Sequence, residues 1–303
     1  MSEQAALHAE SLGKRYGSKW ALRDCTLEVP AGSVTALVGP NGAGKTTLLQ
    51  LAVGLSRPSA GEVRVLGLSP KADARALLPR IGFVAQEHPL YRGFTVAETL
   101  KLGRKLNPTW QESIALERIE QLGLPLGRRV GKLSGGQQAQ VALTLALAKR
   151  PELLLLDEPV ASLDPLARRE FLQSMMEAVV ETGMTVILSS HIVADLERVC
   201  DHLVILSQAE TQLAGEIDEI VASHRLLTGP RSDPAAVARV HEVIRESHTE
   251  RQTTLLVRAN GHVYDSAWEL HQVDLEEIVL AYLGHRTAPA TPVRAQLKEA
   301  VNS

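Results

Sequence analysis

The sequence is poor in cysteine and in aromatic residues. It has two cysteines, Cys25 and Cys200, among 303 residues, and Phe, Trp and Tyr together make up 3%. A disulfide framework uses many more cysteines, so the sequence predicts a fold held by an apolar core in a reducing compartment. The hydrophobic content of 45% and charged content of 22% are typical of a globular protein that can bury such a core.

Long apolar runs are also missing. The run Leu153–Leu156 is far shorter than the roughly 20 apolar residues that a membrane-spanning helix needs. The first residues, Met1–His8, lack the basic and then apolar segments of a signal peptide. We therefore expect that any work at a membrane is done through a partner.

Neither sign of charge dominates. The sequence has 32 basic and 35 acidic residues, which gives a net charge of −3. No global basic field attracts nucleic acid, and we expect no nucleic-acid partner.

One stretch carries specific chemistry. An apolar, β-branched run, Val34–Val38, predicts a buried strand, and Thr47–Val53 predicts a helix. Between them lies the pattern G-x-x-x-x-G-K-T, in the order that a phosphate-binding P-loop needs; the alternative is a plain glycine-rich turn. The lysine would neutralise phosphates and the threonine hydroxyl would bind Mg²⁺. The candidate phosphate-binding residues are Gly39, Pro40, Asn41, Gly42, Ala43, Gly44, Lys45, Thr46 and Thr47.

A second element, the acidic pair Asp157-Glu158, follows the four leucines at 153–156. A strand buried on both faces would deliver Asp157 to the carboxyl edge of a parallel sheet, where ligands of open α/β folds bind. Asp157 would hold Mg²⁺, and Glu158 would polarise the attacking water. The alternative is an acidic strand end that faces solvent.

A third element is Leu133-Ser-Gly-Gly-Gln137, just before a predicted helix. The hydroxyl of Ser134, the backbone N–H groups of Gly135 and Gly136 and the helix N-terminus can form an anion-binding nest. The alternative is a serine N-cap with flexible glycines. A second phosphate site is useful if it closes over a nucleotide held by another copy of the chain.

The order of predicted elements indicates an α/β fold. Residues 6–38 contain short alternating segments, which predict antiparallel strands and a hairpin ahead of the P-loop. Residues 95–150 have helical periodicity and predict a helical insertion. Leu153–Asp157, Met184–Ser190 and Leu203–Leu206 predict buried strands with helices between them, hence a mostly parallel sheet covered on both faces.

A domain boundary is expected near His224. We predict a nucleotide-binding domain at 1–224 with a helical part at about 87–150, a small α+β appendage at 225–286, and a flexible tail at 287–303. The predicted elements of the appendage are a helix at Ala235–Ser247, a strand at Thr253–Val257 and an amphipathic helix at Leu275–Leu283.

Together, these motifs resemble the ATP-binding subunit of an ABC transporter, from about Leu7 to about Ile220. The Leu133–Gln137 signature is highly specific to that superfamily. The resemblance implies a P-loop NTPase fold, ATPase activity, and ATP and Mg²⁺ as cofactors.

The resemblance also implies roles for residues that would mean little alone. Tyr16 would stack on adenine, and Gln86 would sense Mg²⁺ and the attacking water. Asp164, in Ala161-Ser-Leu-Asp164, would act at the dimer interface, and His191 would hydrogen-bond the γ-phosphate. Three departures from the family pattern are Gln140 in place of a frequent arginine, Thr144-Leu145 in place of Ala-Arg, and the variant segment Pro159–Asp164. None is at a phosphate-contacting position.

By the same resemblance, two copies, or this chain and a related ATPase subunit, bind head to tail around two ATP. Each ATP lies between one P-loop and the signature, Ser134–Gln137, of the other subunit. A separate transmembrane permease is the expected partner, with the chain peripheral on the cytoplasmic face of the membrane. The segment Glu87–Phe94 would dock it; the alternative is that Tyr91 and Phe94 cap the helical insertion from inside.

The direction of transport follows only from a local likeness. The ending Leu275-Glu-Glu-Ile-Val-Leu is similar to that of subunits paired with ABC-2-type drug and antibiotic exporters, which predicts export of a small molecule. The alternatives left open are an importer subunit, a soluble ABC ATPase acting on DNA or ribosomes, and a sensor that binds ATP without turnover. The transported substrate is not readable from this chain.

Overall fold

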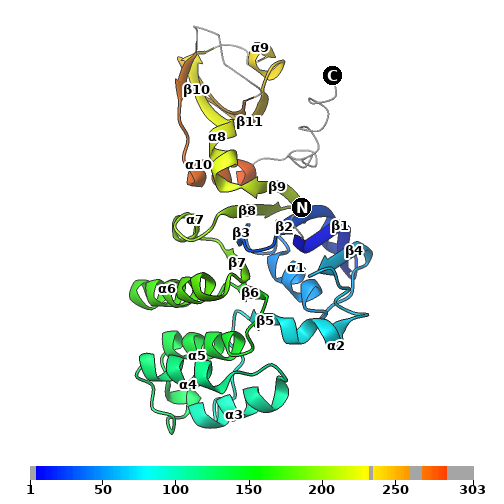
Figure 1. Ribbon diagram of the computed structural model, residues 1–303. Coiled ribbons are helices and arrows are strands. Elements are labelled where there is room, and N and C mark those ends of the chain that lie inside the picture. The colour runs from blue at the N-terminus through cyan, green and yellow to red at the C-terminus, as the bar shows by residue number, and fades with distance from the viewer. Residues whose placement is uncertain (1–4, 232–234, 260–267, 285–303) are drawn as a thin grey trace.

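The computed structural model describes residues 5–231, 235–259 and 268–284, and the predicted tail at 287–303 lies outside them. Its strands form three sheets (Figure 1). They are β1 (Ala5–Tyr16), β2 (Lys19–Pro30), β3 (Val34–Val38), β4 (Ala60–Val65), β5 (Ile81–Val84), β6 (Leu153–Asp157), β7 (Thr185–Ser190), β8 (His202–Ser207), β9 (Glu210–Glu216), β10 (His224–Pro230), β11 (Glu242–His248), β12 (Gln252–Arg258) and β13 (Glu269–His271).

Helices separate most of these strands. They are α1 (Lys45–Ala52), α2 (Ala74–Leu77), α3 (Val96–Leu106), α4 (Glu112–Gln121), α5 (Gly135–Leu147), α6 (Pro165–Thr182), α7 (Val193–Leu196), α8 (Ile217–Ser223), α9 (Ala235–Ala238) and α10 (Leu275–Gly284), with 3₁₀ helices η1 (Leu78–Arg80) and η2 (Val130–Lys132). No helix among the described residues is long and apolar enough to cross a membrane.

The central sheet has the strand order β5-β6-β7-β3-β8-β9. The first five strands are parallel, and β9 pairs antiparallel with β8 at the edge. The predicted, mostly parallel sheet is therefore confirmed. The strand β9 and the helix α8 were not predicted, because β9 is a polar edge strand with little apolar alternation.

Side chains alternate between two cores on the faces of this sheet. Leu154 and Leu156 pack in one core with α5 and α6, whereas Leu153 and Leu155 pack in the other with α1 and the N-terminal sheet. All five residues of β6 are buried. Burial of each leucine side chain stabilises the fold by about 2 kcal/mol, so this strand is a rigid support for the carboxylates at its end.

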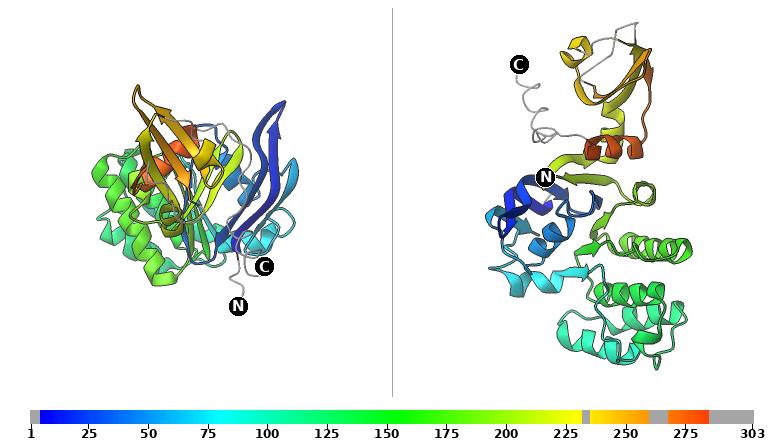
Figure 2. Two further views of the ribbon diagram at one scale, coloured as in Figure 1. Left: turned by 90° about the horizontal axis from the view of Figure 1, so that it is seen from above. Right: turned by 180° about the vertical axis from the view of Figure 1, so that it is seen from behind.

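The N-terminal residues form an antiparallel sheet in the order β2-β1-β4, which confirms the predicted β subdomain. Figure 2 shows the β1–β2 hairpin and the sheet of the C-terminal appendage as two separate projections. The helical insertion is also present: α3, α4 and α5 surround a small core of their own. Helix α3 begins with a capping box between Thr95 and Glu98, which fixes its start.

The C-terminal appendage is a four-stranded sheet in the order β11-β12-β10-β13. The predicted helix at Ala235–Ser247 is wrong in its second half, where β11 pairs antiparallel with β12. Val243 packs against one core of the appendage and Ile244 enters the core of the central sheet, so neighbouring side chains face opposite sides. Cross-strand pairing thus overrides a helix-favouring composition.

Helix α10 covers the central domain as well as the appendage. Ile278, Val279 and Tyr282 are buried in the same core as Leu203 and Ile205 of β8. The Tyr282 hydroxyl lies 3.0 Å from Nε2 of His224, whose Nδ1 lies 2.7 Å from the Ile220 carbonyl oxygen. The boundary at residue 224 remains a prediction.

Candidate active site

The P-loop connects the buried end of β3 to the first turn of α1. Gly44 has φ +109°, and an added Cβ there would lie 2.4 Å from the carbonyl oxygen of Ala21. At Gly39 an added Cβ would lie 2.3 Å from the carbonyl oxygen of Leu206. Both positions therefore require glycine, because backbone atoms on either side leave no room for a side chain.

Lys45, the first residue of α1, is held by backbone carbonyl oxygens and by the carboxylate of Glu158. Its Nζ donates to the Gly39 carbonyl oxygen at 2.7 Å and lies 3.1 Å from Oε1 of Glu158. The exposed fractions of the two side chains are 6% and 8%. The loop thus presents a buried ammonium group beside a buried carboxylate.

Asp157, Thr46 and Ser189 form a connected set of oxygen atoms at the end of β6. The Thr46 hydroxyl donates to Oδ1 of Asp157 at 3.1 Å, and the Ser189 hydroxyl donates to the same oxygen at 3.0 Å. The Ser189 hydroxyl also accepts from the Glu158 backbone N–H at 2.8 Å. Ser189 was not predicted as a site residue; its only sequence signal is a hydroxyl near the end of a buried strand.

Glu158 lies in a strained turn directly after β6. Its φ is +46°, a left-handed conformation that costs about 1–3 kcal/mol in a non-glycine residue. The Ser189 hydrogen bond on its N–H holds this turn. Its Oε2 lies 2.9 Å from Nδ1 of His191, so two of the three predicted catalytic residues, Glu158 and His191 but not Gln86, are in contact with each other.

A pocket of about 570 Å³ opens beside these groups. Its lining residues are Tyr16, Lys19, Ala21, Pro40, Asn41, Gly42, Ala43, Gly44, Lys45, Thr46, Thr47, Gln86 and Glu158. Tyr16 is half exposed, and Nζ of Lys14 lies 5.0 Å from its ring centroid. Lys19 and Ala21 were not predicted, because only the folding of the hairpin against the P-loop brings them to this pocket.

The residues present fit a nucleotide triphosphate with Mg²⁺. Among the described residues no three His, Cys, Asp or Glu side chains gather as a metal site. Mg²⁺ at a nucleotide site is bound by one or two carboxylates together with phosphate oxygens and water, and needs no such group. The adjacent oxygen atoms of Thr46 and Asp157, next to the P-loop amides and Lys45, are a donor set of this kind.

The predicted signature lies away from this pocket of its own chain. Ser134 is the N-cap of α5, and its hydroxyl accepts from the Gln137 backbone N–H at 3.2 Å. Asp164 is the N-cap of α6 and accepts from two backbone N–H groups at 3.0 Å. An added Cβ at Gly136 would lie 2.8 Å from the Cβ of Ala167, so the N-terminal turns of α5 and α6 pack closely. Neither Asp164 nor any residue of Ser134–Gln137 lines the phosphate pocket.

Gln140 is buried between these two helices. Its Nε2 lies 3.5 Å from the Ser174 hydroxyl, and its Oε1 has no hydrogen-bond partner among the described residues. The glutamine at position 140, where the family often has arginine, therefore affects the packing of α5 against α6.

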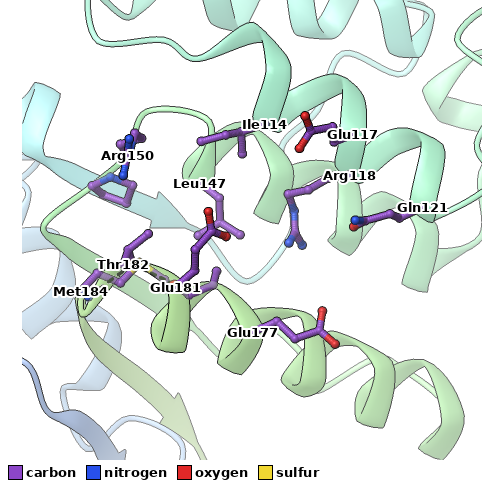
Figure 3. A pocket seen from close by; sticks show the side chains of 12 residues that line it. Ile114, Glu117, Arg118, Gln121, Leu147, Arg150, Glu177, Glu181, Thr182 and Met184 are labelled. Atoms are coloured by element: carbon purple, nitrogen blue, oxygen red, sulfur yellow. Dashed lines mark hydrogen bonds between the residues drawn. The ribbon is translucent and has the colours of Figure 1, made fainter.

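A second, smaller pocket lies between α4 and α6, with a volume of about 240 Å³. Figure 3 shows Arg118 reaching from α4 into this space, toward which Glu181 projects from α6. Burial lowers the pKa of Arg118, while the charges of Glu177 and Glu181 act in the opposite direction. Nε of Arg118 has no hydrogen-bond partner among the described residues. The pocket contains no P-loop or signature residue.

Comparisons with known proteins agree with a nucleotide-binding site at the P-loop. A family model described as "ABC transporter" matches residues 22–161. An uncharacterized ABC transporter ATP-binding protein of Bacillus subtilis, YxlF, is 38% identical over 220 residues, 71% of this chain and 72% of that protein.

Relatives of both transport directions occur. The Fe(3+) ions import ATP-binding protein FbpC of Pseudomonas fluorescens is 38% identical, over 69% of this chain and 61% of that protein. The Nod factor export ATP-binding protein I of Rhizobium johnstonii is 35% identical over 66% of each chain.

Among solved structures, cbiO1 of Clostridium perfringens, described as part of the ABC transporter complex cbiONQ, is 28% identical. It matches with a TM-score of 0.63 over 73% of this chain and 92% of that one. The ATP-binding cassette MJ0796, in a dimeric post-hydrolysis state bound to ADP and Pi, is 26% identical. Its TM-score is 0.62 over 69% of this chain and 98% of that one.

Proposed function

The chain belongs to the family of ABC transporter ATP-binding proteins, and we propose that it is the ATP-hydrolysing motor subunit of an exporter of small molecules. As a member of the family it is an ATPase that binds ATP. The observation that carries the site assignment is the contact of Lys45, Glu158 and His191 beside the P-loop pocket.

We assign the catalytic roles as follows. Lys45 and the P-loop amides bind the phosphates, and Thr46 and Asp157 would hold Mg²⁺, which supplies charge neutralisation when bound. Glu158 orients and polarises the attacking water, and His191 contacts both Glu158 and the γ-phosphate. Gln86, which lines the pocket, would contact the metal and the attacking water. Tyr16 would stack on the adenine ring.

We propose a head-to-tail dimer, either of two copies or with a related subunit. The separation of Ser134–Gln137 from the P-loop pocket of the same chain supports this proposal, because the signature can then act on the nucleotide of the partner subunit. Contacts with the γ-phosphate favour the closed dimer and are lost on hydrolysis, which is the differential binding that a motor needs.

We propose that a separate transmembrane permease is driven by this dimer at the cytoplasmic face of the membrane. Export is supported by the sequence of α10 and by the Nod factor export relatives. The importer relatives favour import as the second candidate.

The test is affinity capture from detergent-solubilised membranes with the full chain carrying Glu158→Gln and with ATP present. Recovery of a polytopic membrane protein that stimulates the wild-type ATPase supports the transporter proposal. Capture of ribosomal or DNA-associated proteins alone would contradict it. For direction, the complex is reconstituted in vesicles with its ATPase side outward: accumulation of substrate inside corresponds to export, and ATP-driven loss from inside to import.

A further inference from the structure

Lys19, in the β1–β2 hairpin, is a pocket residue that the proposed catalytic roles leave unused. The turn of this hairpin is Gly17-Ser18, and Gly17 has φ +59°, which suits the first position of a two-residue hairpin turn. The turn pairs Tyr16 of β1 directly with Lys19 of β2. Both side chains are exposed, and both line the P-loop pocket. Lys19 therefore lies beside the residue proposed to stack on the base.

Lys19 supplies the net charge of the pocket lining. The other charged lining residues are Lys45 and Glu158, whose Nζ and Oε1 lie 3.1 Å apart, so their charges offset each other. Lys19 has no carboxylate of a described residue within 4.0 Å. A cation that lines a pocket without a counter-ion favours the binding of an anionic group there.

The neighbouring cations of the hairpin have contacts of their own. Nζ of Lys14 donates to a backbone carbonyl oxygen at 2.8 Å and lies 5.0 Å from the ring centroid of Tyr16. The guanidinium group of Arg15 lies 5.6 Å from the ring centroid of Trp20. The Lys19 ammonium group has no such contact within the described part of the chain. Of these three cations, Lys19 is therefore the one whose charge is available to a ligand of the pocket.

The position of the hairpin determines which part of a nucleotide Lys19 can meet. Ala21, two residues further along β2, packs against the P-loop, because an added Cβ at Gly44 would lie 2.4 Å from its carbonyl oxygen. The lysine of a P-loop, here Lys45, reaches the β- and γ-phosphates. Between these phosphates and a base stacked on Tyr16 lie the ribose and the α-phosphate. The α-phosphate is the anionic group of the two.

Resting on the proposed function, in which Tyr16 stacks on the base, we infer that Lys19 is a nucleotide-binding residue whose ammonium group contacts the α-phosphate. ATP and ADP both carry this phosphate, so the contact contributes equally to the binding of substrate and product. Binding that is the same before and during the reaction lowers KM without raising kcat. Lys19 thus raises the affinity for both nucleotides and does not distinguish between them.

The test is equilibrium titration of the full chain with ATP, ADP, AMP and adenosine, in wild type and in Lys19→Gln. Glutamine keeps a long polar side chain and removes the charge. We expect the affinity for ATP, ADP and AMP to fall by one common factor of about 3- to 10-fold, and the affinity for adenosine to stay unchanged. The loss should shrink as salt rises, because added ions screen an exposed charge.

Steady-state ATP hydrolysis gives an independent readout. In Lys19→Gln the KM for ATP and the inhibition constant of ADP should rise together, with kcat unchanged. Lys19→Arg keeps the charge and should restore most of the affinity. The matched control is Ser18→Ala, an exposed position in the same turn that does not line the pocket, and it should behave as wild type.

The outcomes are distinct. If Lys19→Gln binds all four compounds as wild type does, or if its loss spares AMP, the inference is wrong while the proposed function stands. If adenosine binding weakens as much as ATP binding, Lys19 acts on the nucleoside instead, and the inference is equally overturned. If the wild-type chain binds no ATP at all, the proposed function itself fails.

Discussion

The Nζ of Lys45 lies 3.1 Å from Oε1 of Glu158, with both side chains almost fully buried. The phosphate-binding cation and the proposed base of one chain thus neutralise each other. A buried ion pair is strongly destabilised when one partner is removed or drawn away, so a triphosphate must compete with Glu158 for Lys45. The predictions for these two residues are therefore coupled.

Replacing Glu158 with Gln should reduce ATP turnover by roughly 10²–10⁴-fold, because the general base is lost. ATP binding should become tighter, because Lys45 loses its competing carboxylate. Phosphate release and equilibrium ATP titration measure the two effects. Glu152→Gln, which alters an exposed pair with Arg80, is the control and should leave both unchanged. Normal turnover in Glu158→Gln would remove this residue from the role of base.

Replacing Lys45 with Ala should weaken ATP binding itself by about 10-fold or more, since one charge-assisted contact to phosphate is worth about 1.5–3 kcal/mol. Adding Glu158→Gln to this variant should not produce the gain in ATP affinity that it produces in the wild type, because the ion pair no longer exists. A titration with ATP in all three variants forms the cycle, and the exposed Lys71→Ala is the control. Strictly additive effects of the two substitutions on binding would contradict a shared pair.

Replacing Ser189 with Ala should lower turnover by about 10-fold with little change in ATP affinity. The Glu158 N–H would lose its acceptor, and a buried unsatisfied group costs about 1–3 kcal/mol. The strained turn that places the carboxylate would relax. The steady-state rate and the ATP dissociation constant separate these effects. Ser190→Ala removes a hydroxyl that instead accepts from Ile192 N–H, and serves as the control.

The sequence places the P-loop, Asp157 and Glu158 at one edge of a parallel sheet, because their positions follow from a local loop and from strand ends. In the structure these residues are in contact, and their roles stay predictions. Ser189 and Lys19 could not be found in this way, since their place at the site depends on which strand lies beside β6 and on how the hairpin folds over α1. The same reason explains the error at β11, where pairing with β12 decides the conformation. The pairing of the signature with a second copy stays a prediction.

Replacing Arg118 with Met should stabilise the fold by about 1 kcal/mol. The methionine side chain still packs as the aliphatic part of Arg118 does. The substitution removes a partly buried charge whose Nε has no hydrogen-bond partner among the described residues. Urea unfolding of both proteins measures the change, with the exposed Arg75→Met as control. Destabilisation by a similar amount would mean that Arg118 is held by Glu177 and Glu181 in solution.

Acidification should destabilise the fold through three buried histidines, His88, His202 and His224, because burial lowers the pKa of each. Burial lowers the pKa of His202 and of His224 from 6.5 to about 4. Between these values the unfolded chain takes up protons that the folded chain does not, so stability is constant above about pH 6.5 and falls as the pH drops toward 4. The slope is about 1.4 kcal/mol per pH unit for each histidine.

Urea unfolding at several pH values measures this slope. His224→Gln should reduce it by the share of one histidine, about 1.4 kcal/mol per pH unit, whereas the exposed His271→Gln should leave it unchanged. A free energy of unfolding that stays level from pH 6.5 to 4.5 would contradict buried, neutral histidines.

The packing of α10 against β8 limits how such chains can change over evolutionary time. Because Ile278, Val279 and Tyr282 complete the core that lies over β8, helix α10 and the nucleotide-binding sheet share one set of packing constraints. A recombination that joined this sheet to a foreign C-terminal region would leave that face of the sheet open to water. The two parts are therefore expected to be inherited together, with substitutions in α10 matched by substitutions in β8, and with His224 and Tyr282 varying as a pair.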